Sequence, residues 1–154
     1  MIKLKPLIIS ILIAFAFGIL GTILGGNFSN YEIINRPIFS PPAIVFPIIW
    51  TILYTLMGVS SYLIYTSNAN ETEKKSALSI YLIQLIINAL WPLIFFRFKL
   101  YLLAFIWIIL LIIAVIIMIY RFYKINTTAA YLQIPYLLWL IFASVLNYNI
   151  YLLN

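Results

Sequence analysis

The sequence predicts an all-α integral membrane protein, a bundle of five transmembrane helices, and three observations carry this prediction. Hydrophobic residues make up 66% of the 154 residues, and charged residues only 8%. The mean hydropathy is +1.16, and a soluble domain with so few charges could not cover its surface. Apolar runs of about 20 residues, the length that crosses a bilayer, recur five times along the chain. The length suits a single domain over residues 1–154.

Composition also excludes several kinds of chemistry. The chain has no cysteine, histidine or aspartate, and its only acids are Glu32, Glu71 and Glu73. Catalytic triads, His-ligated haem and metal sites are therefore not expected. None of the five spans carries an ionisable group, which disfavours ion transport. The net charge of +6 comes from cations at the ends of apolar runs, a pattern of membrane topology rather than of nucleic-acid binding.

The first predicted helix covers residues 7–24 and follows Lys3 and Lys5. These features also fit a signal peptide, although the apolar run continues beyond its small residues. Four small residues recur at the spacing that lets membrane helices approach closely. They predict a packing face, within the chain or between two chains, unless they reflect only the high glycine content of membrane helices. The four are Ala14, Gly18, Gly21 and Gly25.

A loop at residues 25–42 leads into the second predicted helix, residues 43–65. A loop of this length either covers a ligand site or simply connects two spans. The helix carries Phe46, Trp50 and Tyr54 at four-residue steps, which places three aromatic rings in one stripe.

The third predicted helix covers residues 76–96, with Asn70 and Glu73 before it as an N-terminal capping pair. Two amides and two aromatic rings fall on one of its faces. Amides facing lipid would be costly, so this face should point into the bundle. The face consists of Gln84, Asn88, Trp91 and Phe95.

The last two predicted helices cover residues 101–120 and 129–153. The first of them is almost uniformly apolar, and we expect it to be the most lipid-exposed helix. The second places Trp139, Ala143 and Asn147 on one face. Seven tyrosines near helix ends are predicted to anchor the protein at the membrane interface. They are Tyr62, Tyr65, Tyr81, Tyr120, Tyr123, Tyr131 and Tyr151.

Basic residues predict the orientation in the membrane. Five spans place the termini on opposite sides, with six basic residues on the N-terminal side and three on the other. The sequence therefore predicts a cytoplasmic N-terminus and an external first loop. The two groups are Lys3, Lys5, Lys74, Lys75, Arg121 and Lys124, and Arg36, Arg97 and Lys99.

Three helices carry the aromatic and amide stripes. If these stripes face one another, they form a pocket suited to a flat, largely apolar ligand, which aromatic faces stack on and an amide orients. The alternative is that the rings and amides only pack the helices together.

The same residues resemble the motifs of the translocator protein family (TspO/MBR), also called tryptophan-rich sensory proteins and, in animals, peripheral benzodiazepine receptors. The resemblance covers nearly the whole chain and points to a bacterial-type member. Its motifs are Tyr31, Arg36-Pro37, Pro41-Pro42, Trp50, Leu53-Tyr54 and Met57-Gly58, then Gln84-Leu85, Asn88, Trp91-Pro92 and Phe95-Phe96, then Pro135-Tyr136, Trp139, Phe142-Ala143 and Leu146-Asn147.

The resemblance implies a homodimer in a bacterial cell membrane, with a pocket closed by the first loop. It implies protoporphyrin IX as ligand or substrate, with no required cofactor, and binding of isoquinoline carboxamides and benzodiazepines. Animal members end their fifth helix with a sterol motif that needs a basic residue after a tyrosine. No such residue follows Tyr151 here, which disfavours sterol transport. The expected ligand-binding residues are Tyr31, Pro42, Phe46, Trp50, Tyr54, Gln84, Asn88, Trp91, Phe95, Trp139, Phe142, Ala143, Leu146 and Asn147.

Three functions stay open at this point. The first is a membrane sensor or regulator that holds a porphyrin, with Arg36 either attracting a propionate or serving the loop's structure. The second is a light-dependent enzyme that degrades protoporphyrin IX, with Trp50 and Trp139 as catalytic redox and stacking residues. The third is a passive transporter of porphyrins or other lipophiles.

Overall fold

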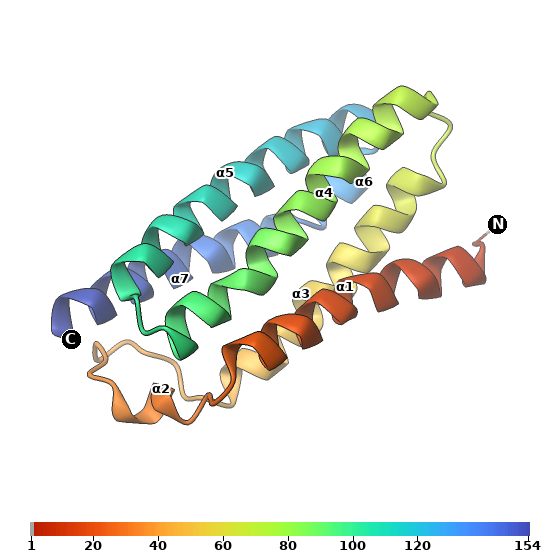
Figure 1. Cartoon of the computed structure of the whole chain (residues 1–154). Coiled ribbons are helices and arrows are strands. Elements are labelled where there is room, and N and C mark those ends of the chain that lie inside the picture. The colour runs from red at the N-terminus through yellow and green to blue at the C-terminus, as the bar shows by residue number, and fades with distance from the viewer. Residues whose placement is uncertain (1) are drawn as a thin grey trace.

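The computed structural model describes residues 2–154 and is an all-α bundle, as expected (Figure 1). Within that range, five helical segments are long and apolar enough to cross a membrane. The helices are α1 (Leu4–Gly25), α3 (Val45–Tyr65), α4 (Glu71–Pro92) with its π-helical continuation η1 (Leu93–Arg97), α5 (Tyr101–Ile125), and α7 (Ile134–Leu153), which the short α6 (Thr127–Tyr131) precedes. A further short helix, α2 (Asn30–Ile33), lies within the first loop.

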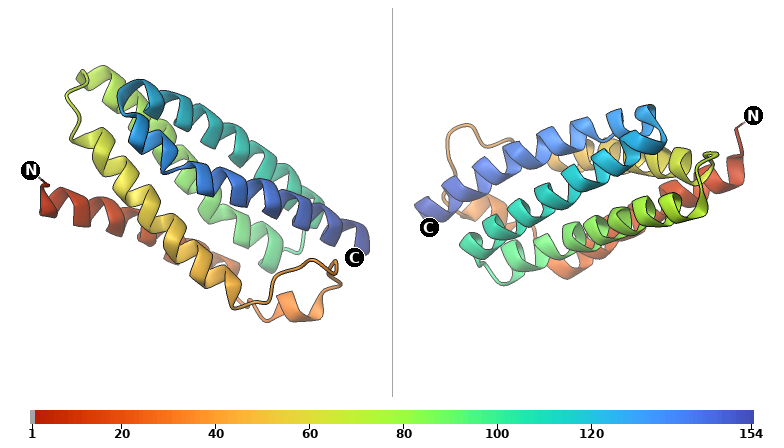
Figure 2. Two further views of the ribbon diagram at one scale, coloured as in Figure 1. Left: turned by 180° about the vertical axis from the view of Figure 1, so that it is seen from behind. Right: turned by 90° about the horizontal axis from the view of Figure 1, so that it is seen from above.

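The helices run side by side, and the two termini lie at opposite ends of the bundle (Figures 1 and 2). Helix α1 packs against α3 and α4, while α5 packs against α4 and α7. The first loop and α2 lie at the same end as the C-terminus (Figure 2). This arrangement places the termini on opposite sides of a membrane, as five spans require. Which side is cytoplasmic stays a prediction.

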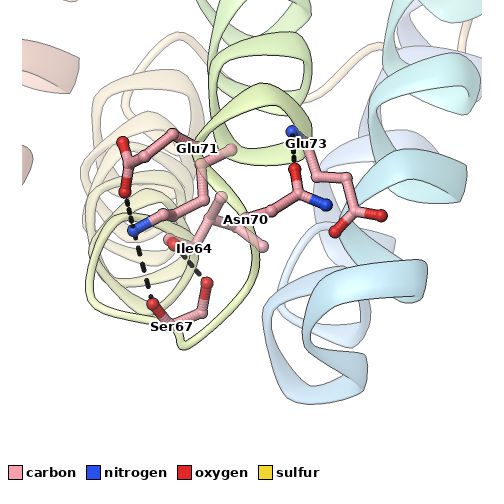
Figure 3. A network of polar contacts seen from close by, with 6 residues as sticks. Ile64, Ser67, Asn70, Glu71 and Glu73 are labelled. Carbon is pink, nitrogen blue, oxygen red and sulfur yellow. Dashed lines mark hydrogen bonds and ion pairs between the residues drawn. The ribbon is translucent and has the colours of Figure 1, made fainter.

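Several helix boundaries differ from those expected, and the helix expected over residues 129–153 is divided into α6 and α7. Two of the differences have a clear local cause. Helix α4 begins at Glu71, five residues before the predicted start at residue 76. Its N-terminus is stabilised by the side chain of Asn70, whose Oδ1 accepts a hydrogen bond of 2.8 Å from the backbone N–H of Glu73 (Figure 3). The predicted cap is thus present. The carboxylate of Glu71 also pairs with the ammonium group of Lys74 at 2.6 Å.

The other difference is at the end of α5. This helix continues to Ile125, so most of the expected loop at residues 121–128 is helical. Neither proline nor glycine interrupts the segment, and Arg121 and Lys124 can extend their charged ends beyond the apolar zone. The chain turns only at Asn126, whose side chain accepts a hydrogen bond of 2.9 Å from the N–H of Ala129 and starts α6.

The small residues of α1 form a packing face within the chain. Gly21 lies against α4: a Cβ atom there would be 3.2 Å from the carbonyl oxygen of Ala89. On the other side, Gly58 of α3 lies against α1, and a Cβ there would be 2.5 Å from the Cα of Ile11. Glycine at these two positions lets the helix backbones approach closely. Of the alternatives for this stripe, packing inside one chain is therefore the one observed.

The expectation that the fourth span is the most lipid-exposed is wrong. Helix α5 buries seven residues, including Ala104 and Ala114, because it lies between α4 and α7. Helix α1 buries only Ala14, Gly21 and Gly25. Composition misleads here because lipid tails and helix interfaces are both apolar, so a uniformly apolar helix suits either environment.

The prediction of interfacial tyrosines is wrong for two of the seven. Tyr62 and Tyr81 are buried, with 7% and 5% of their surface exposed. The hydroxyl oxygen of Tyr62 accepts a hydrogen bond of 2.9 Å from the backbone N–H of Lys3, which ties the start of α1 to α3. The other five are exposed at helix ends, and their role as anchors stays a prediction.

Candidate functional site

A cavity of about 550 Å³ lies among α1, α3, α4, η1 and α7, next to the first loop. Its walls are almost entirely apolar, and its volume is within the range of small-molecule sites. The structure brings ten of the expected binding residues together around it. They are Tyr31, Phe46, Trp50, Tyr54, Asn88, Trp91, Phe95, Ala143, Leu146 and Asn147.

The α3 wall is a stacked pair of rings. Trp50 and Tyr54 are nearly parallel, with ring centroids 5.3 Å apart. The hydroxyl oxygen of Tyr54 accepts a hydrogen bond of 3.1 Å from Nδ2 of Asn88 on α4. The other end of the Asn88 carboxamide makes no hydrogen bond within residues 2–154. Because Asn88 lines the cavity, this end is available to a ligand.

A second wall comes from α4, η1 and α7. Trp91 stacks on Phe95, with centroids 4.7 Å apart. The indole Nε1 of Trp91 donates a hydrogen bond of 3.2 Å to Oδ1 of Asn147, and Nδ2 of Asn147 donates one of 2.8 Å to the carbonyl oxygen of Tyr101. These bonds fix the plane of the Trp91 ring. Asn147 is therefore a positioning residue, since both ends of its amide are used inside the protein.

After Pro92 the helix continues as a π-helical turn, in which the N–H of Phe98 donates a hydrogen bond of 3.0 Å to the carbonyl of Leu93. Such turns occur often at functional sites. Phe95 and the neighbouring Phe96 both line the cavity. Phe96 packs against Phe28 of the first loop, with centroids 4.6 Å apart.

The first loop lies across one end of the bundle (Figure 2). Tyr31, in the loop helix α2, is buried and lies edge-on to Phe46, with centroids 5.0 Å apart. Its hydroxyl donates a hydrogen bond of 2.9 Å to the carbonyl of Pro41. The guanidinium of Arg36 lies 4.4 Å from the centre of the Tyr31 ring, a cation–π contact that holds the loop together.

The loop is also tied to the end of α7. The backbone N–H of Asn35 donates to Oδ1 of Asn154 at 3.1 Å, and Nδ2 of Asn154 donates to the carbonyl of Asn35 at 2.9 Å. The side chain of Asn35 donates to the carbonyl of Leu153 at 3.2 Å. These exposed hydrogen bonds tie the first loop to the C-terminal end of α7.

Four expected residues do not line the cavity. Gln84 is fully buried and accepts a hydrogen bond of 2.9 Å from the hydroxyl of Tyr136. Trp139 lies behind Phe46, with centroids 5.8 Å apart, and also contacts Phe142. Phe142 and the exposed Pro42 lie outside the wall. A role of these residues in binding stays a prediction.

The sequence reasoning missed the wall contributed by α1. Phe15, Ile19 and Thr22 line the cavity from this helix, and the small-residue spacing around Gly18 and Gly21 was the available signal. Ile19, Thr22 and Thr51 are exposed as well as lining. The cavity therefore opens sideways at the surface between α1 and α3.

Comparison with known proteins agrees with this architecture. The family model described as TspO/MBR family matches residues 10–153. The chain belongs to the TspO/MBR family. The motif resemblance is thus confirmed, and the five apolar helices of this TspO/MBR protein are those of an integral membrane protein.

Several relatives align along most of their length. Tryptophan-rich protein TspO of Archaeoglobus fulgidus is 36% identical over 99% of both chains. Tryptophan-rich sensory protein of Cereibacter sphaeroides is 33% identical over 80% of this chain and 76% of its own. Human translocator protein is 33% identical over 86% of this chain and 82% of its own. This TspO/MBR protein is therefore similar to archaeal, bacterial and animal members.

Proposed function

We propose that this protein is a membrane sensor or regulator that binds protoporphyrin IX and similar flat apolar ligands in the bundle cavity. The observation that carries the proposal is the pair of aromatic walls, Trp50 on Tyr54 and Trp91 on Phe95. A planar macrocycle buries apolar area against both walls. Each aromatic contact adds about 0.5–1.5 kcal/mol beyond that burial.

Polar groups give the ligand an orientation. The free end of the Asn88 amide is its oxygen, which lies in the wall and accepts a hydrogen bond from a pyrrole N–H of the porphyrin. Arg36 lies on the ring of Tyr31, which itself lines the cavity. Its positive charge attracts the propionates of a porphyrin at the loop end, while an uncharged benzodiazepine gains nothing from it.

The test is a titration of protoporphyrin IX into the detergent-solubilised protein, followed by the absorption of the porphyrin. We expect Trp50→Leu and Trp91→Leu each to weaken binding about 3- to 10-fold, as the loss of one aromatic contact implies. Trp107→Leu is the matched control, because Trp107 lies outside the cavity and bonds the carbonyl of Ile87 at 2.8 Å. Equal affinity in all three variants would place the ligand elsewhere.

A second candidate function, light-dependent degradation of the bound porphyrin, is supported by the position of Trp50. Its indole lines the cavity and stacks on Tyr54. In this proposal the excited porphyrin takes one electron from the indole of Trp50, and the porphyrin radical anion reacts with dioxygen, the oxidant, as the macrocycle opens. The electron then returns from the oxygenated porphyrin to the Trp50 radical cation. Trp139, which contacts the wall residue Phe46, is the second tryptophan in this role.

Illumination of the complex separates the two candidates. A catalyst gives a discrete product that free porphyrin does not give under the same light, and its rate falls in the Trp50→Phe, Trp139→Phe double variant. A binding protein gives the product mixture of free porphyrin, with the same yield in wild type and variant.

The proposal includes a homodimer in a bacterial cell membrane with a cytoplasmic N-terminus. The orientation is supported by the excess of basic residues at the N-terminal end of the bundle. The dimer is supported by the resemblance to the family.

A further inference from the structure

A second cavity, of about 530 Å³, lies at the other end of the bundle, where the chain begins. It is enclosed by the first half of α1, the last turns of α3 and the early part of α4. It shares no lining residue with the aromatic cavity. It is therefore a separate site, which the porphyrin-binding proposal does not use.

The inner wall of this cavity contains two neighbouring buried hydroxyl groups, those of Tyr81 and Ser61. Tyr81 lines the cavity with only 5% of its surface exposed, and its hydroxyl has no hydrogen-bond partner within residues 2–154. Ser61 lines the same wall, but its hydroxyl donates to the carbonyl of Gly58 at 3.0 Å. The hydroxyls of Tyr81 and Ser61 are thus the polar groups of a mostly apolar inner wall, where they can hydrogen-bond a polar group of a bound molecule.

The remaining walls identify the kind of partner. Ile9, Ile13 and Leu82 line the cavity and are exposed on the outer surface of their helices. The cavity therefore opens towards the acyl chains of the bilayer. Lys5 lines it at the start of α1, the position where a lysine reaches the phosphate layer.

The helix ends on this side of the bundle carry a net positive charge, because four lysines outnumber Glu71 and Glu73. Lys3 and Lys5 lie at the start of α1, and Lys74 and Lys75 lie at the start of α4. Of these four, Lys74 is paired with Glu71. Basic residues at this level attract anionic headgroups.

We propose that this cavity is a binding site for one anionic glycerophospholipid. The phosphate lies at Lys5, an acyl chain lies along Ile13 and Leu82, and the ester carbonyl accepts a hydrogen bond from the hydroxyl of Tyr81. Charge, hydrogen bond and apolar wall thus match the three parts of one lipid. Annular lipids, by contrast, need only the outer surface of the helices.

Native mass spectrometry of the full chain in detergent tests the site, with phosphatidylglycerol and phosphatidylcholine of equal chain length as probes. We expect one phosphatidylglycerol to bind saturably, at least fivefold more tightly than phosphatidylcholine. Lys5→Gln should remove this preference. The matched control is Lys3→Gln, which changes the same charge on the same helix end but not a cavity residue. Equal losses in the two variants would mean unspecific attraction and would overturn the site.

Two further variants separate binding from folding. Ile13→Trp fills the cavity and should abolish the saturable lipid, whereas Ile23→Trp, exposed on the same helix and outside both cavities, should not. Tyr81→Phe removes the hydroxyl that donates to the lipid and should weaken phosphatidylglycerol binding severalfold. Unchanged lipid affinity in both Ile13→Trp and Tyr81→Phe contradicts the proposal. Displacement of the lipid by equimolar oleate would assign the site to a free fatty acid instead.

Discussion

The buried hydrogen bond between Gln84 and Tyr136 allows a sharp test of how this bundle is held together. Both side chains are almost fully inaccessible, at 0% and 1% exposure, and the hydroxyl of Tyr136 donates to Oε1 of Gln84 at 2.9 Å. The Nε2 group of Gln84 has no partner within residues 2–154. The amide is thus satisfied at one end only.

This asymmetry predicts unequal effects of removing the two partners. Tyr136→Phe leaves the whole Gln84 amide unpaired. We expect it to lower the free energy of unfolding by about 1–2 kcal/mol. This value lies between the average contribution of a side-chain hydrogen bond in a membrane protein and the full cost of leaving a buried polar group unpaired. Gln84→Leu orphans only the Tyr136 hydroxyl and also removes the unpaired Nε2, so about 0–1 kcal/mol is expected. The double variant should be close to wild type, because both polar groups are gone.

The measurement is equilibrium unfolding in SDS, followed by far-UV circular dichroism, on the four proteins of this double-mutant cycle. The coupling energy should be about 2 kcal/mol in magnitude, the sum of the two single losses, because the double variant is close to wild type. Additive losses, or a Gln84→Leu variant less stable than Tyr136→Phe, would refute the reasoning. Protoporphyrin affinity should stay within twofold of wild type in the double variant, since neither residue lines the aromatic cavity.

Two further predictions concern the contact between α1 and α3 and the hydrogen bonds of the first loop. Gly58→Ala should lower the free energy of unfolding by about 1–2 kcal/mol. This value is the cost of overpacking against the Ile11 backbone minus the gain in helix propensity. Unchanged unfolding in SDS would show that α1 and α3 separate freely. Asn35→Ala should speed amide exchange across residues 28–41 about fivefold, corresponding to about 1 kcal/mol for its lost bond to Leu153. An unchanged exchange rate would show that the contacts with Asn154 alone hold the loop.

The fold could be predicted from the sequence because span length and composition are strong signals in a membrane protein. The position of the cavity followed from the stripes on three helices, since amides such as Asn88 are costly in lipid and must face inward. The same reasoning could not distinguish a residue that lines the cavity from one that only holds a lining residue in place. Asn147 and Gln84 were expected to meet a ligand, but their amides bond to Trp91 and Tyr136.

The misplaced and missed residues have a common cause. Trp139 and Ala143 occupy one helix face, yet only Ala143 lines the cavity, because the ring of Phe46 fills the space in front of Trp139. The wall from α1 was missed because its lining residues, such as Ile19, do not differ from those that face lipid. In both cases the outcome depends on a neighbour that helix periodicity does not reveal.

Helix α1 forms part of the wall of both cavities. Its residues from Lys5 to Ile13 line one cavity, and those from Phe15 to Thr22 line the other. Between these two stretches, the backbone of α1 at Ile11 packs directly against Gly58 of α3. A molecule bound in either cavity therefore contacts the helix that also lines the other cavity. If a molecule bound in one cavity tilts α1, the affinity of the other cavity for its own ligand changes as well. The two ligand affinities must then change by the same factor, whichever molecule binds first.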